Sequence, residues 1–316
     1  MRPNRIQRRD WTPNRNKLKA AWHFQSLRQD RQITPSMLIQ DIPAGLMPWR
    51  FVKTDTYNVE IVGDDDHKEQ ATALLQSLGR YDHQDLRELT ASAFEEIAKQ
   101  LSWYGRAPYE IARAEDDKSI YLLSPFTSHR LFSLQIFYIQ LIPKNDRDYW
   151  KKSIVLLPWR DVWIVSLPSE LGGYRGYRAL LRKLSRFGST GPAFWRKDLG
   201  QGKSYPVNFD FSEYRRQLEI FEARVTRRWG WNRRDYSQKN WTEFATFYRT
   251  ITFKWAQAVL REHILKEFNS LLSRLRIDAE LRMTGLPNSA HVLDLRNQMT
   301  KVVIGYGAAT SAASVG

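Results

Sequence analysis

Apolar residues recur at spacings of three and four in several parts of the chain, a pattern that predicts amphipathic helices. These helices are expected at about residues 85–104, 172–187, 213–229 and 243–275. Gly105 follows the first, where a helix-ending glycine belongs. Ser212 and Thr242 precede the last two, where a hydroxyl can cap a helix. At 1.5 Å per residue the last helix would span about 50 Å, which is typical of an elongated subunit or an assembly.

Alternating apolar and polar residues predict several short strands between and before these helices. Strands are expected at 57–62 and 161–165, a hairpin at 108–114 and 119–125, and further strands within 131–142 and 153–158. Residues 63–66 are expected to form an acidic turn, and the tail at 305–316 is expected to be mobile.

The amino-acid composition excludes several classes of protein. The chain has 316 residues, 42% of them hydrophobic and 41 of them aromatic, which excludes a wholly disordered protein. It contains no Cys, which excludes a disulfide scaffold, thiolate metal sites and cysteine nucleophiles. The longest apolar run, at 131–142, is too short to span a membrane, and no secretion signal is evident.

Charge is distributed unevenly around a net charge of +15. Residues 1–32 carry a net +7, residues 64–117 a net −7, and residues 174–234 a net +10. Each run could be a solvated face. Basic surfaces of this size also attract polyanions, because cations that face phosphates release condensed counterions. Modules of opposite sign further allow head-to-tail contact between copies of the chain.

The usual catalytic and cofactor motifs do not occur in the sequence, and we expect no cofactor. The chain lacks a P-loop, a G-x-S-x-G elbow and an H-E-x-x-H pair. Asp64, Asp65, Asp66 and His67 could be drawn as a metal cluster, but consecutive residues in a turn cannot all face one ion. The basic context of RRWGWNRRD instead makes this segment a candidate contact for a polyanion or partner. Its candidate residues are Arg227, Arg228, Trp229, Trp231, Arg233 and Arg234.

Several short motifs, taken in order, resemble those of tailed-bacteriophage portal proteins, the ring subunits of the head-tail connector. They are WYGRAPYEI at 103–111, LLSP at 122–125, RDVWI at 160–164, GYRGYRALL at 173–181 and EHILKEFNSLL at 262–272. The resemblance covers roughly residues 85–290.

The resemblance implies an α+β, ring-forming subunit with long stem and wing helices, commonly of about twelve copies at one capsid vertex of the virion. Double-stranded DNA would pass through the ring during packaging and ejection. The partners implied are the major capsid protein, the terminase and head-tail adaptor proteins, with no membrane. The protein would be made in the host cytoplasm and would be structural rather than enzymatic.

Mapped onto the chain, the resemblance implies five parts. These are a basic N-terminal arm and irregular segment at 1–55, a wing-like helix and β-rich module at 56–170, a stem helix with a compact clip loop at 171–208, a long-helix wing or crown module at 209–304, and a flexible tail at 305–316.

Two sets of basic residues follow from this mapping. The candidate DNA-channel or clip-proximal residues are Arg175, Arg178, Arg182, Lys183 and Arg186. Salt bridges to the acidic module of a neighbouring subunit are an equal alternative for each. The basic arm contributes Arg2, Arg5, Arg8, Arg9, Arg15, Lys17 and Lys19.

Two other functions remain open from the sequence. One is a sequence-independent nucleic-acid-binding protein, monomeric or dimeric, that uses the arm and residues 215–234. The other is a metal-dependent nuclease or integrase that uses scattered carboxylates. Its carboxylates would be Glu60, Asp64, Glu95 and Glu110.

Overall fold

The structure is a computed structural model of the 316-residue chain. It describes residues 37–47, 57–79, 85–114, 120–125, 131–134, 136–141, 154–190, 211–231 and 242–313. Side chains are described throughout these ranges except at 185–190, 211–214 and 302–313.

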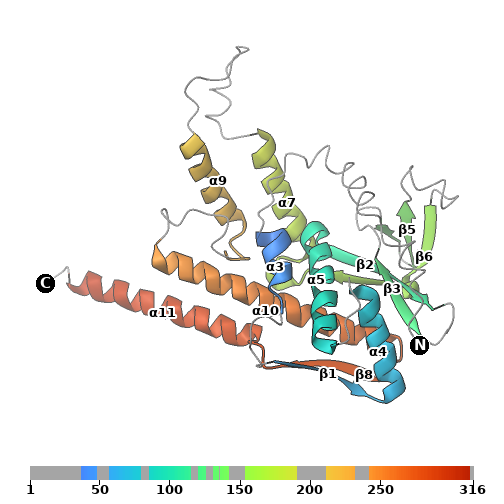
Figure 1. Ribbon diagram of the computed structural model, residues 1–316. Coiled ribbons are helices and arrows are strands. Elements are labelled where there is room, and N and C mark those ends of the chain that lie inside the picture. Colours follow the sequence, from blue (N-terminus) through green and yellow to red (C-terminus); the bar gives the residue numbers. More distant parts are fainter. Residues whose placement is uncertain are drawn as a thin grey trace, which may run out of the picture.

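In the described part of the chain, helices and three small antiparallel sheets make up an α+β fold, as the resemblance implies (Figure 1). The helices are α3 (Ile42–Ala44), α4 (Asp65–Leu78), α5 (Leu86–Tyr104), α7 (Gly173–Thr190), α9 (Phe211–Val225), α10 (Glu243–Arg274) and α11 (Ser289–Ala313), with short turns η1 (Met37–Asp41), η4 (Trp159–Asp161) and η5 (Ser169–Leu171). Within the described residues, no helix is both long enough and apolar enough to cross a bilayer.

The strands lie where alternation predicts them, with one addition. They are β1 (Asn58–Gly63), β2 (Arg106–Arg113), β3 (Tyr121–Pro125), β4 (Leu131–Ser133), β5 (Phe137–Leu141), β6 (Ile154–Pro158), β7 (Val162–Ser166) and β8 (Ala279–Thr284). The expected hairpin is confirmed, because β2 pairs with β3 and also with β7. β4, β5 and β6 form a separate sheet. The addition is β8, which the sequence pattern did not reveal.

Local capping signals place two helices correctly. Asp85 accepts a hydrogen bond from the backbone N–H of Arg87 at 3.0 Å and begins α5. Gly105 ends α5 in the left-handed conformation, at φ 75°. Thr242 accepts a bond from the N–H of Ala245 at 3.2 Å and begins α10. These side chains satisfy backbone groups that a helix end leaves unpaired.

Two local expectations were wrong. Residues 64–66 are not a free turn, because Asp64 precedes α4 and the next two carboxylates lie in its first turn, where the helix dipole favours negative charge. Ser212 does not cap α9, which begins one residue earlier at Phe211. The helix α11 extends into the tail at 305–316 and ends at Ala313.

The main hydrophobic core joins the two ends of the described chain. β1 pairs antiparallel with β8, with Ile61 opposite Leu281. The core continues from Met37 to Leu281 and includes Phe94 of α5 and Phe268 of α10, both 0% exposed. Side chains from both 56–170 and 209–304 therefore share one core.

α10 is the element around which the other elements pack. Trp163 of β7 lies edge-on to Phe268, with ring centroids 6.5 Å apart. Arg261, only 8% exposed, donates to the carbonyls of Leu46 and Pro287. Gln257 donates to the carbonyl of Asp41 at 3.2 Å. These bonds fix segments from both ends of the chain to one helix.

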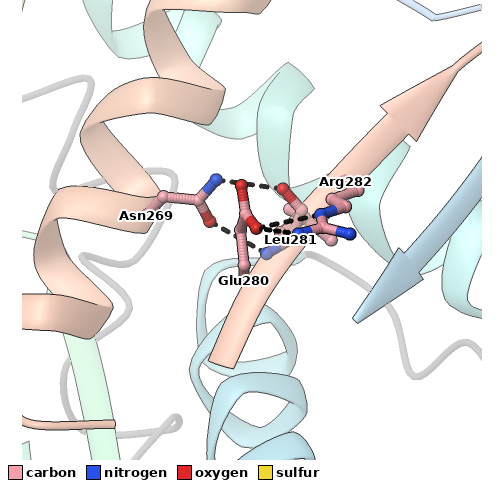
Figure 2. A network of polar contacts seen from close by, with 4 residues as sticks. All are labelled: Asn269, Glu280, Leu281 and Arg282. Atoms are coloured by element: carbon pink, nitrogen blue, oxygen red, sulfur yellow. Dashed lines mark hydrogen bonds and ion pairs between the residues drawn. The ribbon is translucent and has the colours of Figure 1, made fainter. Parts of the chain in front are cut away.

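Asn269 connects α10 to β8, as Figure 2 shows. Its side-chain amide donates to the carbonyl of Leu281 and accepts from the N–H of the same residue, both at 2.9 Å. Next to it, Arg282 bonds Glu280 at 2.7 Å on the exposed face of the strand. The asparagine of the EHILKEFNSLL motif thus holds a strand distant in sequence.

Candidate nucleic-acid interface

Two helices, α7 and α9, stand out from the same side of the body (Figure 1). Tyr177, near the start of α7, packs on Trp229, which lies just beyond the end of α9, with ring centroids 5.4 Å apart. The start of one helix therefore lies beside the end of the other, so the pair is antiparallel. Residues 191–210, which connect their outer ends, lie outside the described residues.

The base of α7 is fixed against the end of α5. The hydroxyl of Tyr177 donates to the carbonyl of Ser102 at 2.5 Å, and its ring is buried. A side chain at Gly105 would lie 3.2 Å from the ring of Tyr174 and 3.3 Å from that of Tyr177. Two of the motifs, WYGRAPYEI and GYRGYRALL, therefore pack directly against each other.

α7 has one apolar face and one cationic face, as its sequence predicts. Tyr177 and Leu184 are buried at 1% exposure each, while Leu180 and Leu181 are half-buried against the same core. The opposite face carries the exposed candidate residues Arg175, Arg178, Arg182 and Lys183. Residues 173–184 contain no Asp or Glu, so the charge of this face is not neutralised from within the helix.

α9 and the turn after it add further exposed cations. The exposed ones are Arg215, Arg216, Arg224, Arg227 and Arg228. Glu219 and Glu222, the acidic residues among the described side chains of this segment, are each only 5% exposed. Glu219 lies 3.8 Å from the guanidinium of Arg215, which is 80% exposed. The outward surface of the pair is therefore strongly positive.

Trp229 and Trp231 do not belong to this surface, which corrects the expectation that they contact a polyanion or partner. They are 2% and 0% exposed and lie in the main core. Gly230 between them has φ 75° and turns the chain so that both rings face inward. Rings buried in this way are not available to stack on bases.

Arg249 of α10 is a residue of this region that sequence reasoning missed. It donates to the carbonyls of Ala223 at 2.8 Å and Gly230 at 2.6 Å, and to the hydroxyl of Thr226 at 3.2 Å. It therefore fixes the end of α9 and the turn after it to α10. The one signal in the sequence was an arginine in the first two turns of a largely apolar helix.

The structure does not place every predicted basic residue. Those outside the described residues are Arg233, Arg234 and the arm residues Arg2, Arg5, Arg8, Arg9, Arg15, Lys17 and Lys19. Arg186 lies within α7, but its side chain is not among those described.

Acidic side chains gather at the opposite side of the molecule. Asp64, Asp65, Asp66 and Glu69 are exposed around the start of α4, away from α7 and α9 (Figure 1). Lys68 pairs with Asp65 at 3.1 Å but leaves most of this charge uncompensated. The separation of charge read from the sequence is thus a separation in space.

The carboxylates proposed for a nuclease do not meet. Glu60, Asp64, Glu95 and Glu110 belong to different elements, and Glu95 pairs with Lys99 at 2.7 Å. Burial raises the pKa of Glu110, and the negative charge of nearby Asp161 raises it further. Among the described residues, no group of three or more His, Cys, Asp or Glu side chains could hold a metal ion.

Comparison of the chain with models of protein families and with curated proteins gives no match.

Proposed function

We propose that the protein is the portal protein of a tailed phage, a ring subunit through which double-stranded DNA is packaged and ejected. The observation that carries the proposal is the antiparallel α7–α9 pair, which projects from an α+β body and exposes cations on its outer surface. In the proposal α7 is the stem helix that the resemblance assigns to 171–208, and the clip loop after it lies outside the described residues.

The positions of the motifs support the resemblance. Gly105 of the first motif packs beneath Tyr174 and Tyr177 of another. Asn269 of the last motif holds the backbone of β8. Two of the motif segments are therefore in contact where α5 ends and α7 begins, and a third holds β8 to α10.

The cationic surface suits a channel in which DNA must slide. Contacts directed at phosphates position a duplex without reading its sequence. Arg175, Arg178 and Arg182 lie on the exposed face of α7 at spacings of three and four, so they form one line along the helix. In a ring, such lines from successive subunits would surround the duplex with distributed positive charge. The capsid protein, terminase and adaptors would bind elsewhere on the same ring.

The experiment that tests the proposal measures the mass of the purified protein and images it by negative stain. We expect rings of about a dozen subunits with a central hole. In the variant Arg175→Gln/Arg178→Gln/Arg182→Gln the rings should persist, but the slope of duplex DNA binding against salt should become shallower by up to about three units for each subunit that contacts the duplex. Arg282→Gln is the control, because that exposed residue lies on β8, away from α7.

A second candidate function is a monomeric or dimeric protein that binds nucleic acid without sequence preference. The exposed cations of α7 and α9 favour it equally, because they need no ring to bind phosphates. A monomer or dimer that binds duplex DNA with a steep salt slope, and that never yields rings, would support this function and contradict the portal proposal.

A further inference from the structure

The turn that follows α9 carries two exposed arginines between buried residues. Thr226 and Trp229 are 0% and 2% exposed. Arg227 and Arg228, which lie between them, are exposed. We call residues 226–231 the elbow. Its exposed side chains are both cationic, because its two tryptophan rings lie in the core.

Arg249 of α10 holds the elbow at both ends. Its guanidinium donates to the hydroxyl of Thr226 at 3.2 Å and to the carbonyl of Gly230 at 2.6 Å. Its backbone carbonyl accepts a hydrogen bond from the N–H of Trp231 at 2.9 Å. An arginine suits this position, because its N–H donors form a rigid fork that can serve several acceptors at once. One residue therefore fixes the beginning and the end of the elbow.

The middle of the elbow is fixed as well. The N–H of Trp229 donates to the carbonyl of Thr226 at 2.8 Å, which closes a turn around the two arginines. The ring of Trp229 packs on Tyr177 of α7, with ring centroids 5.4 Å apart. The backbone that carries Arg227 and Arg228 is therefore ordered before any ligand binds, and this lowers the entropy lost on binding.

The elbow lies beside the start of α7. A Cβ added at Gly172 would lie 3.5 Å from the Nη1 atom of Arg228 and 3.9 Å from the backbone of Gly176. The guanidinium of Arg228 therefore reaches the first turn of α7, which also carries Arg175. The cations of the elbow and those of α7 adjoin each other at the base of the helix pair.

The two arginines of the elbow are not neutralised. Within the described part of the chain, neither Arg227 nor Arg228 forms an ion pair or a hydrogen bond, and Glu219 of α9 lies near Arg215 instead. A guanidinium matches the geometry of phosphate oxygens. The centre of a protein interface is instead enriched in aromatic residues and depleted of most charged ones. The elbow turns its rings inward, so its surface suits phosphate better than protein.

We propose that the elbow is a second phosphate-binding element, beside the cationic face of α7, in which Arg227 and Arg228 contact the DNA backbone and Arg249 positions them. These contacts would be independent of sequence, because phosphate contacts carry no sequence information directly. The inference rests on the proposed function, since it takes double-stranded DNA as the ligand of the α7–α9 pair.

The first experiment neutralises the elbow at exposed positions, which should not change the fold. In Arg227→Gln/Arg228→Gln, the slope of duplex DNA binding against salt should become shallower by up to about two units for each subunit that contacts the duplex. Arg276→Gln/Arg282→Gln is the matched control, because it removes the same charge from exposed residues beyond the far end of α10. The control should keep a slope closer to that of the wild type. Equal slopes in the two variants would overturn the inference.

The second experiment tests the positioning role of Arg249. Arg249→Lys keeps the positive charge but lacks the fork that serves both ends of the elbow. We expect weaker DNA binding although every exposed arginine remains. Combined with Arg227→Gln/Arg228→Gln, its loss should be smaller than the sum of the separate losses, because both changes act on the same contacts. A purely structural role would give losses that add.

A milder variant keeps this test decisive if Arg249→Lys fails to fold. Thr226→Val retains the shape of a buried side chain and removes one acceptor of Arg249. It should give a smaller loss of DNA binding that is also less than additive with Arg227→Gln/Arg228→Gln. Wild-type DNA binding by folded Thr226→Val and additive losses in the combination would contradict the positioning role.

The outcomes separate this inference from the proposed function. Wild-type rings whose DNA binding is unchanged by Arg227→Gln/Arg228→Gln would overturn the elbow and leave the portal proposal standing. If that variant binds DNA normally but no longer forms rings, the elbow is a contact between subunits and the inference is wrong. A wild-type protein that never forms rings, yet loses salt dependence in the variant, would support the elbow and contradict the portal proposal.

Discussion

Gly230 lies between the buried Trp229 and Trp231, which follow the exposed Arg227 and Arg228, and its backbone conformation is one that glycine adopts readily. Its φ of 75° is a conformation that side chains disfavour. A Cβ at this position would lie 2.2 Å from the backbone nitrogen of Phe253 and 2.3 Å from the carbonyl oxygen of Arg249. No movement of a flexible side chain can relieve such contacts. Glycine is therefore required where α9 meets α10.

The variant Gly230→Ala should lose at least about 2 kcal/mol of unfolding free energy, because strain and steric overlap add. Denaturant unfolding followed by tryptophan fluorescence measures the loss. Gly176→Ala is the matched control, because nothing lies within 4 Å of its added Cβ and it sits within α7. That control should be neutral or stabilising by up to about 1 kcal/mol. Equal stability of the two variants would contradict the close approach at Gly230.

A similar comparison tests Asn269. Asn269→Leu leaves the N–H and the carbonyl of Leu281 without their partner and should cost about 2–3 kcal/mol of unfolding free energy. Ser270→Ala, next to it, removes only an exposed bond to the carbonyl of Lys266 and should change the unfolding free energy by less than about 0.5 kcal/mol. Thermal unfolding of both variants measures the difference. A small effect of Asn269→Leu would show that β8 is held by its pairing with β1 alone.

The attachment of α7 to the body depends on Tyr177, and this gives the helix a pH dependence. Burial raises the pKa of Tyr177 above its usual value, so the folded protein keeps the phenol protonated. The unfolded chain loses that proton near pH 10. The stability associated with this group is therefore complete below about pH 10 and falls as the pH rises beyond it.

Tyr177→Phe removes both the hydrogen bond and the titration. At pH 7 the variant should be less stable by about 1–2 kcal/mol, because the carbonyl of Ser102 loses its donor. Between about pH 10 and pH 11 the gap between wild type and variant should narrow. Urea unfolding at a series of pH values checks this. A gap that stays constant with pH would contradict the assignment of the raised pKa to Tyr177.

The helices that carry a clear local signal were predicted. α4 was missed because its signal was interpreted as that of a turn. α5, α7 and α10 each combine apolar residues at helical spacing with a cap or a glycine at one end. α4 has the same signal in Ala71, Leu74, Leu75 and Leu78, but its acidic start was interpreted as a turn. Carboxylates in a row are compatible with both structures, because the first turn of a helix also favours negative charge.

The described chain is joined by one main core, which determines how it unfolds. That core includes α5, β2, β7 and α10, so the parts assigned to 56–170 and 209–304 are held together. We expect a single cooperative transition, in which far-ultraviolet circular dichroism and tryptophan fluorescence coincide.

Phe268→Ala should shift both signals together and cost about 3–5 kcal/mol, because Phe268 is fully buried against Trp163. Leu295→Ala, at 42% exposure, is the control and should cost less than about 1 kcal/mol. Two separated transitions, with only one moved by Phe268→Ala, would show that the long-range packing is not cooperative.

The sequence by itself determined the local elements and the charge of each segment. Caps, glycines and periodicity act within a few residues, so Gly105 and Thr242 could be interpreted without any knowledge of the fold. The cationic face of α7 follows from the same spacing, and its exposure is confirmed at Arg175 and Arg178.

Only the tertiary structure decided which of these features face outward. Pairing of β1 with β8 joins strands more than 200 residues apart, and no local pattern specifies that partner. Trp229 and Trp231 were candidate contacts because arginines flank them in the sequence. In the structure, the conformation of Gly230 and its bond from Arg249 place both rings in the core. The exposed positions Phe132 and Leu156 of β4 and β6 could not be distinguished from buried ones, because alternation shows that two faces differ and not which of them the chain itself covers.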